Sequence, residues 1–269
     1  APIAGARSHI EELVSLFDFE EVSIPTNGWF TERTVEAARR LAERFGPKVT
    51  IAVSVDGPRE THDAIRRKPG SFDRLMETFT RLRSIEGLRV AFLSTLCERN
   101  AGELPGLIES LASLGPDYHA VNILRGTPMD PGTRLEPGTA RRFWAFLEGH
   151  YRAAGYGRRR GVASVPLNYV RVRWDASLRT LEEKRQAVPC LGGTATVVVH
   201  PDGGVGPCET LPAVDSIKRR PLPEILASPA WERVTRSIQA KECHCTHECN
   251  LKSSIFLNPF LYGSLLWGR

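Results

Sequence analysis

Cysteine spacing is the feature of this chain that most constrains what it can form. Five of its six cysteines lie between residues 190 and 249. They are Cys190, Cys208, Cys243, Cys245 and Cys249. The start of the chain lacks the charged-then-apolar order of a secretory signal, so we expect a cytoplasmic protein. Thiols this dense in a reducing compartment predict a metal centre rather than disulfides.

A predicted hairpin brings two of these thiols together. Cys190 precedes the apolar, strand-like run 196–200, and Cys208 follows the turn Pro201-Asp-Gly-Gly204. Because a hairpin reverses the chain, both thiols would return to the same end. The triplet that ends the series would then supply the remaining ligands. Sulfur donors in groups of four suit zinc or an iron-sulfur cluster, and the donor types alone leave both open.

Size, charge and hydropathy exclude several classes of protein. The 269 residues are 41% hydrophobic and 25% charged, as in an ordinary globular protein with one large domain or a large and a small one. The formal net charge is +5, and no aromatic-basic motif accompanies the arginine clusters, so we expect no nucleic-acid partner. The most apolar stretch, 255–267, falls short of the ~20 residues of a spanning helix, so we expect no membrane partner.

The first half of the chain alternates helical and strand-like patterns. Strands are expected at 21–24, 49–55, 89–95 and 118–124. Helices are expected at 35–45, at 137–154 and from Phe72 onward, with Ser71 as the N-cap. This alternation is typical of consecutive βα units around a parallel sheet. The turns that follow the strands would lie on one rim, where ligands gather in such folds.

A break in the pattern suggests how the chain is divided. The Arg-rich and Gly-rich stretch Gly155 to Gly161 follows the last helix of the βα region. We therefore predict a βα core at 1–156, a linker or connecting segment at 157–188 and a small cysteine-rich module at 189–269.

Several motifs resemble one known family. In chain order they are Ile24-Pro-Thr-Asn-Gly28, Ser54-Val-Asp-Gly-Pro58 with His62-Asp63 and Arg66, and Gly70-Ser-Phe-Asp73. Together they resemble the radical S-adenosylmethionine (radical SAM) family. The tail resembles that family's SPASM/Twitch extension through Pro189-Cys190, His200-Pro-Asp-Gly203, Pro207-Cys208 and Cys245-x-x-x-Cys249. The resemblance implies an α/β fold, namely a partial (β/α) barrel of the radical SAM type with a C-terminal SPASM/Twitch module.

The resemblance also implies a segment that this sequence does not contain. Relatives have six β/α units, and the four strands expected here match the third to the sixth. The first two units carry the Cys-x-x-x-Cys-x-x-Cys loop for the SAM-cleaving 4Fe-4S cluster. We therefore expect either a truncated sequence, which we favour, or a degenerate homologue. The chain alone would be inactive, with a second 4Fe-4S cluster only in the full-length protein.

The chemistry that the resemblance implies is radical chemistry on a peptide or small-molecule substrate. A cluster would pass an electron to S-adenosyl-L-methionine, and the resulting 5′-deoxyadenosyl radical would abstract hydrogen from substrate. The expected class is an oxidoreductase or maturase, with an electron donor such as flavodoxin or ferredoxin. A non-catalytic metal-binding scaffold and a zinc module on a βα fold are the alternatives.

Six residues of the βα region are carried over as cofactor-binding candidates. They are Asn27, Ser54, Asp56, Arg66, Thr95 and Ile123. Ser54 and Asp56 would bind the ribose or the amino-acid part of SAM, and Arg66 its carboxylate. Each has an ordinary alternative as well, such as turn chemistry at Asp-Gly-Pro or a core position at Ile123.

In the tail, the resemblance implies that four thiolates hold an auxiliary 4Fe-4S cluster. Cys190 and Cys208 match the first two ligands of the family, and Cys249 matches a late one. The fourth is Cys243 or Cys245, and the Cys-x-x-x-Cys spacing favours Cys245. A structural zinc site that adds His244 or His247 remains the alternative.

Two further residues are candidates for work on the substrate. Glu209, directly after Cys208, resembles in position an acid that some relatives use to take a proton from substrate, so it is the catalytic candidate. Arg125, directly after the fourth expected strand, is a candidate for binding a substrate carboxylate. An exposed, non-functional glutamate is the ordinary alternative for Glu209.

Overall fold

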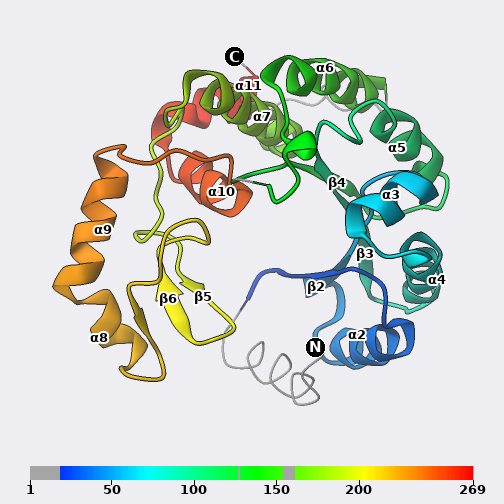
Figure 1. Cartoon of the computed structure of the whole chain (residues 1–269), viewed down its shortest axis with the longest axis horizontal. Coiled ribbons are helices and arrows are strands. Elements are labelled where there is room, and N and C mark those ends of the chain that lie inside the picture. Colours follow the sequence, from blue (N-terminus) through cyan, green and yellow to red (C-terminus); the bar gives the residue numbers. More distant parts are fainter. Residues whose placement is uncertain (1–18, 127, 154–160, 269) are drawn as a thin grey trace. The chain divides into compact units, whose positions relative to one another are not determined.

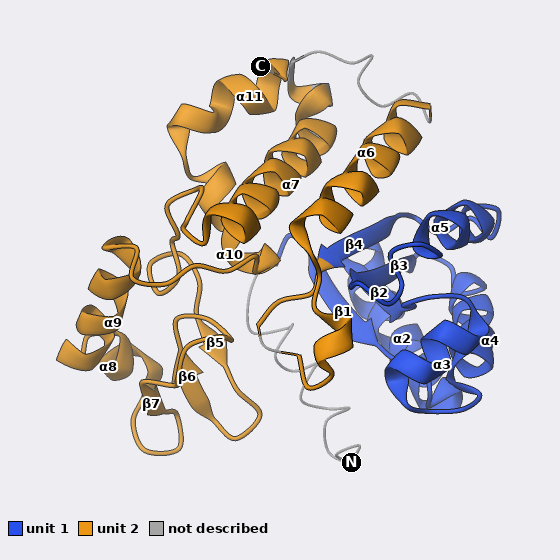
Figure 2. Cartoon of the chain, turned by 45° about the horizontal axis from the view of Figure 1, so that its top comes forward, with its two compact units in different colours: residues 1–122 blue, residues 123–269 orange. Residues whose placement is uncertain are grey.

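The chain forms two compact units, residues 1–122 and 123–269 (Figures 1 and 2). The computed structural model describes residues 19–126, 128–153 and 161–268. Most of the Gly-rich and Arg-rich stretch 155–161, expected to separate two domains, lies outside the described residues. The domain bounds expected at 156 and 188 stay a prediction.

The first unit is built around a parallel sheet of four strands in the order β1-β2-β3-β4. Its elements are β1 (Val22–Thr26), α2 (Thr31–Phe45), η1 (Gly46–Lys48), β2 (Val49–Ser54), α3 (Arg59–Arg66), α4 (Ser71–Arg83), β3 (Arg89–Leu96), α5 (Leu104–Ala112) and β4 (His119–Ile123). All four strands begin and end within two residues of the expected bounds. The α/β fold class is thus confirmed.

Burial explains why these runs form a parallel sheet. The first five residues of β2 are all buried, which fits a strand covered on both faces. In Figure 1 the helices α2 and α4 lie along the outer side of the sheet. Phe79 of α4 stacks on Phe92 of β3 with ring centroids 4.1 Å apart, so an aromatic pair anchors the helix to the sheet.

The start of α4 differs from the expectation. The prediction that Ser71 is the N-cap is wrong, because the helix begins at Ser71 itself and Gly70 precedes it. The cap comes from Asp63 of α3, whose carboxylate accepts from Gly70 N at 2.6 Å and from Ser71 Oγ and Phe72 N, both at 2.8 Å. Asp63 therefore satisfies donors that would otherwise be unpaired at the helix start.

The turn after β1 is held by a close contact that requires glycine. Gly28 has φ +70°, and a Cβ added there would lie 2.6 Å from Leu75 Cα. The Gly28 carbonyl also accepts from Thr78 Oγ1 at 2.7 Å. Any larger residue would push α4 away, so Gly28 fixes where the neighbouring Asn27 lies.

The second unit combines a helical layer with a small antiparallel sheet. Its elements are η2 (Pro131–Thr133), α6 (Pro137–Ala153), η3 (Gly161–Ser164), α7 (Val165–Glu183), β5 (Val198–Val199), β6 (Gly204–Gly206), β7 (Asp215–Ser216), α8 (Leu222–Leu226), α9 (Pro229–Gln239), α10 (Glu248–Phe256), η4 (Pro259–Leu261) and α11 (Tyr262–Trp267). The expected helix at 137–154 is confirmed as α6. The expected hairpin is confirmed by the antiparallel pair β5 and β6.

The helix α7 occupies much of the segment expected to connect two domains. Trp174 of α7 stacks on Trp144 of α6 at 5.5 Å between ring centroids. On the same helix Arg173 is buried, with its Nη1 atom 3.3 Å from Glu248 Oε2. A buried, paired arginine places a charged residue inside the packed face, so the apolar periodicity that normally reveals a helix is obscured.

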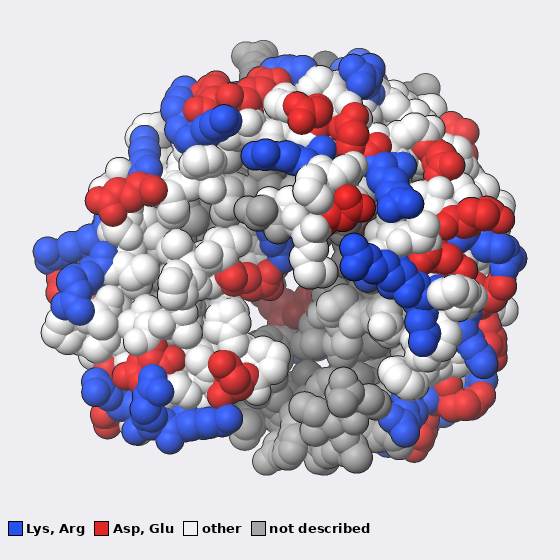
Figure 3. Space-filling view, in the orientation of Figure 1, with Lys and Arg blue, Asp and Glu red and all other residues white. Residues whose placement is uncertain are grey.

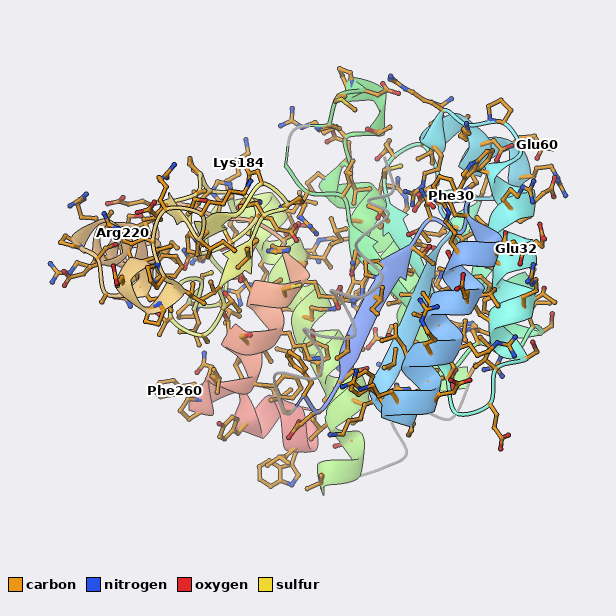
Figure 4. All side chains as sticks on the ribbon, turned by 90° about the horizontal axis from the view of Figure 1, so that it is seen from below. Phe30, Glu32, Glu60, Lys184, Arg220 and Phe260 are labelled. Carbon is orange, nitrogen blue, oxygen red and sulfur yellow. The ribbon has the colours of Figure 1, made fainter. Side chains whose placement is uncertain are left out.

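The surface carries mixed charge and some exposed aromatic residues. Basic and acidic side chains alternate over the face in Figure 3. Phe260, between α10 and α11, is 92% exposed and projects away from the ribbon in Figure 4. Within the described residues, no helix has the length and apolar character needed to cross a bilayer.

Candidate functional site

Four thiols of the second unit lie near one another. Burial raises the pKa of the Cys190 thiol. The thiols of Cys208, Cys243 and Cys245 lie close enough to raise it further. Burial likewise raises the pKa of Cys245, and Cys208 acts in the same direction. All four are free cysteines, brought together from the β5–β6 hairpin region and the segment before α10.

Three of these four thiols border a pocket inside the unit. The space between protein atoms there is about 340 Å³, a figure that includes the solvent at the open mouth of the pocket. It is lined by Cys190, Cys243 and Cys245, and also by His244 and His247. Both histidines that the zinc alternative invoked therefore lie at its wall.

Hydrogen-bond donors already surround the sulfur atoms. Gly192 N lies 3.4 Å from Cys190 Sγ, and the Thr210 hydroxyl lies 3.2 Å from Cys208 Sγ. The Thr210 hydroxyl also hydrogen-bonds the thiol of Cys245. Donors aimed at sulfur stabilise the thiolate form, which is the form that binds metal.

Gln186 connects two of the thiol-bearing segments. Its Nε2 donates to the carbonyls of Ile238 at 2.9 Å and Cys243 at 3.0 Å, and lies 3.9 Å from Cys243 Sγ. Its Oε1 accepts from Cys190 N at 3.0 Å. The buried amide thus holds Cys190 and Cys243 in place through backbone contacts as well as through sulfur.

The donor set fits an iron-sulfur cluster. In the part of the chain that the structure describes, no three His, Cys, Asp or Glu side chains form a group of the size that one metal ion needs. The fit therefore rests on chemistry: four free, partly buried thiols with sulfur-directed donors are the ligand set that iron-sulfur clusters use.

Cys249 faces different neighbours. It lies in the first turn of α10 and is exposed. Partial desolvation raises the pKa of its thiol, and the carboxylates of Glu209 and Glu248 raise it further, while Arg125 lowers it. The influence of the thiols on one another's pKa therefore groups Cys190, Cys208, Cys243 and Cys245, whereas the motif resemblance includes Cys249.

The two substrate candidates pair with each other. Arg125 Nη2 forms an ion pair with Glu209 Oε2, and both side chains are partly exposed, at 34% and 47%. His247 Nε2 lies 3.4 Å from the same oxygen. His247 is buried, and neither ring nitrogen has a hydrogen-bond partner among the described residues. Burial and the charge of Arg125 lower the pKa of His247, and Glu209 opposes them.

In the first unit, three of the predicted SAM-binding residues meet at Asp56. Its carboxylate is buried, lies 2.6 Å from Arg66 Nη2 and accepts from Thr95 N at 2.9 Å. Asp56 thereby joins the ends of β2 and β3 to the end of α3. Its two oxygens are both engaged within the protein.

The other three predicted residues are placed separately. Asn27 is exposed after β1, and its Oδ1 accepts from Trp29 N at 3.1 Å. Ser54 is the last residue of β2 and is partly exposed. Ile123 ends β4 and is buried, as a core residue would be. Asn27 and Ser54 thus lie at the carboxyl ends of neighbouring parallel strands.

Sequence reasoning missed several residues that support these sites. In the first unit, the amide of Asn100 donates to the carbonyls of Asp56 and Thr95, and His62, quoted in the motif without a role, accepts at Nδ1 from Asp56 N at 3.0 Å. In the second, Gln186 and Thr210 had no assigned role. The proximity of Thr210 to Cys208 in the chain was a usable signal, but nothing in the sequence near Gln186 pointed to its contacts.

Comparisons with known proteins place the thiol-bearing segment within a known domain. The sequence profile of SPASM, an iron-sulfur cluster-binding domain, matches residues 190–250. The chain is 28% identical over 222 residues to the AdoMet-dependent heme synthase of Methanosarcina barkeri, covering 78% of this chain and 60% of the relative. It is 26% identical over 242 residues to the sporulation killing factor maturation protein SkfB of Bacillus subtilis, covering 87% of this chain and 52% of the relative.

The resemblance to the radical SAM family, with a SPASM domain at residues 190–250, is thus confirmed. The chain also shares its fold with the solved structure of native anSMEcpe with bound AdoMet and Kp18Cys peptide. The TM-score is 0.56 at 17% identity, over 86% of this chain and 65% of the other. The chain spans between half and two thirds of the length of the curated relatives that it matches, at 60% and 52%.

Proposed function

We propose that this chain is part of a radical SAM enzyme that modifies a peptide and uses an auxiliary 4Fe-4S cluster of the Twitch type. Two similarities support a peptide substrate: SkfB is a maturation protein for a sporulation killing factor, and the anSMEcpe structure holds a peptide. When bound, S-adenosylmethionine supplies a 5′-deoxyadenosyl radical for hydrogen abstraction. Oxidoreductase or maturase chemistry and a small electron donor such as ferredoxin or flavodoxin belong to the same proposal.

The observation that carries the proposal is the meeting of four free thiols inside the segment that matches the SPASM profile. The proximity of the thiols and the motif resemblance both support Cys190, Cys208 and Cys245 as ligands. We assign the fourth position to Cys243, because its thiol interacts with Cys208 and Cys245. Cys249 is the competing candidate.

In the first unit, the proposed task is to bind the methionine and ribose parts of SAM. Arg66 has five N–H donors, and its ion pair with Asp56 leaves others free for a carboxylate. In this proposal Asp56 orients Arg66, while Ser54, Asn27 and Thr95 supply polar groups at the strand ends. A separate proposal, for the last residue of β4, is that Ile123 supplies an apolar contact for the adenine.

Glu209 is the proposed proton acceptor. Its carboxylate is partly exposed next to Cys208, so it can reach a substrate placed beside the cluster ligands. A base must lie within hydrogen-bond reach of the proton it removes. Glu209 meets the requirement of access, and its ion pair with Arg125 holds its position in the free protein.

Anaerobic reconstitution with iron and sulfide tests the proposal. The chain should bind about four irons and turn brown, as a 4Fe-4S protein does. Cys190→Ala and Cys208→Ala should each lose most of this iron. Cys97→Ala is the matched control, because Cys97 is a buried cysteine of the first unit. A colourless protein that binds zinc instead would overturn the proposal.

A second pair of variants decides the fourth ligand. Cys243→Ala should lose cluster absorbance and iron, whereas Cys249→Ala should keep both. Iron content and the visible spectrum are measured together, so that a damaged cluster is distinguished from an absent one. The reverse result would assign the position to Cys249 and reject the contact-based choice.

A further inference from the structure

His247 lies beside the ion pair of Arg125 and Glu209, and its ring makes no hydrogen bond among the described residues. Both ring nitrogens of His247 are buried without a hydrogen bond among the described residues, although Nε2 is 3.4 Å from Glu209 Oε2. A buried polar group without a partner is costly, and proteins retain few of them. The cost at Nε2 is removed if Glu209 turns from Arg125 toward the ring and accepts a hydrogen bond from that nitrogen.

The ion pair itself is easily broken. Arg125 and Glu209 are 34% and 47% exposed, and exposed ion pairs favour the paired state by about fivefold at most. Arg125 uses one Nη atom for Glu209, so its guanidinium still presents other donors. A second carboxylate that binds both Nη atoms would therefore compete well.

The location of Arg125 points to substrate rather than solvent ions. Its positive charge lowers the pKa of the thiols of Cys245 and Cys249, so it lies beside the thiol-bearing segments. Any group bound to Arg125 is thereby held near the proposed auxiliary cluster and near Glu209. This is where a substrate carboxylate would fix the peptide for reaction.

We propose that Arg125 binds a carboxylate of the substrate, and that Glu209 then exchanges Arg125 for the unpartnered ring nitrogen of His247. A neutral imidazole carries one N–H, which suffices to receive the displaced carboxylate. This inference rests on the proposed function and adds the substrate class, an acidic peptide.

Three synthetic pentapeptides test the inference on the reconstituted chain. Each is N-acetylated, with glycines around a central residue: an Asp peptide amide, an Asn peptide amide, and the Asn peptide with a free C-terminal carboxylate. Calorimetry at low salt measures their affinities. The Asp peptide should bind about tenfold more tightly than the Asn amide, a ratio that corresponds to one good charge-assisted contact. The third peptide tells whether a C-terminal carboxylate serves as well as a side chain.

Variants separate the exchange from simple charge effects. Arg125→Gln should abolish the preference for the Asp peptide. Glu209→Gln should tighten Asp-peptide binding about threefold, because the internal competitor is gone, and leave the Asn amide unchanged. The exposed pair of Arg141 and Glu182 provides matched controls, since Arg141→Gln and Glu182→Gln change the net charge equally.

The role of His247 has its own variant. His247→Phe should weaken the Asp peptide and leave the Asn amide unchanged, because the displaced Glu209 then has no new partner. Iron content is measured on the same sample, which shows whether the neighbouring cluster ligands remain in place. If iron is lost, Glu209→Gln alone carries the test.

Several results would overturn the inference. Equal affinity for the Asp and Asn amides would do so, as would no measurable binding of either acidic probe. If Arg125→Gln and Arg141→Gln weakened the preference for the Asp peptide equally, net charge alone would explain that preference. None of these results touches the iron content, so the inference can fail while the proposed cluster stands.

Discussion

Gln186 illustrates how a single buried amide prepares a site. It donates to two carbonyls and accepts one N–H, in addition to its contact with Cys243 Sγ. These bonds form between protein groups alone, so the ligand segments are positioned before any metal binds. Pre-positioned ligands lower the entropy that metal binding would otherwise have to overcome.

Replacing this amide should be costly. Gln186→Leu leaves the carbonyls of Ile238 and Cys243 and the N–H of Cys190 without partners. We expect the free energy of unfolding of the metal-free chain to fall by about 2–4 kcal/mol, and the reconstituted iron content to fall with it. Urea unfolding under reducing conditions measures the first. Gln239→Leu, at an exposed position, is the control, and equal effects of the two variants would refute the assigned role.

At the scale of elements, Asp63 holds the connection between α3 and α4, residues 67–70, which we call the α3–α4 corner. A carboxylate on one helix caps the next, so the two helices are joined by three hydrogen bonds rather than by apolar contact alone. Burial pulls the pKa of Asp63 upward, but the hydrogen bonds from Phe72, Ser71 and Gly70 outweigh it and hold the pKa below its ordinary value. The same α3 ends at Arg66, so the corner also positions a proposed SAM-binding residue.

Removing this cap should destabilise the chain by about 1 kcal/mol, the usual cost of a lost N-cap, when Asp63→Ala is unfolded in urea at pH 7. The pKa of Asp63 is lower in the folded chain than in the unfolded chain. The charged carboxylate therefore stabilises the fold at a pH above its unfolded pKa, and this stabilisation is lost as the pH falls through the folded pKa. The difference between wild type and Asp63→Ala should therefore shrink below about pH 4. Glu60→Ala, at an exposed position of α3 labelled in Figure 4, should show little change at any pH. A constant difference across pH would contradict a charged cap.

At the scale of the whole molecule, stability in acid should depend on a buried histidine. His62 is 1% exposed, and its Nδ1 accepts from Asp56 N. Burial lowers the pKa of His62 to about 4, with Arg66 acting in the same direction and Asp56 against it. In the folded chain His62 therefore stays neutral at a pH where the unfolded chain protonates it, since the ordinary pKa of histidine is about 6.5.

The sign follows from proton uptake. Between about pH 6.5 and pH 4 the unfolded state binds more protons, so the free energy of unfolding of the chain should fall as pH falls, by up to roughly 3 kcal/mol. His62→Gln should remove most of this slope, and His244→Gln, at an exposed position, should leave it. Thermal or urea unfolding across this range provides the measurement. A His62→Gln variant with the slope of wild type would show that other groups cause it.

Much of the fold was predictable because its signals are local. The four strands are short β-rich runs between turn residues, and each was placed within two residues of its bounds. Ser71 was misjudged as a cap because the true cap, Asp63, lies eight residues away in the chain. The helix α7 was missed because Arg173 is buried against Glu248, a pairing that only packing reveals.

The sequence by itself determined the types of donor, the order of the elements and the family, since these follow from local pattern and motif. Only the tertiary structure decided which groups meet. Arg125 pairs with Glu209 across 84 residues, and Gln186 bonds Cys243 across 57. Such contacts depend on how distant segments pack, and local propensity carries no information about which distant partner a polar side chain will find.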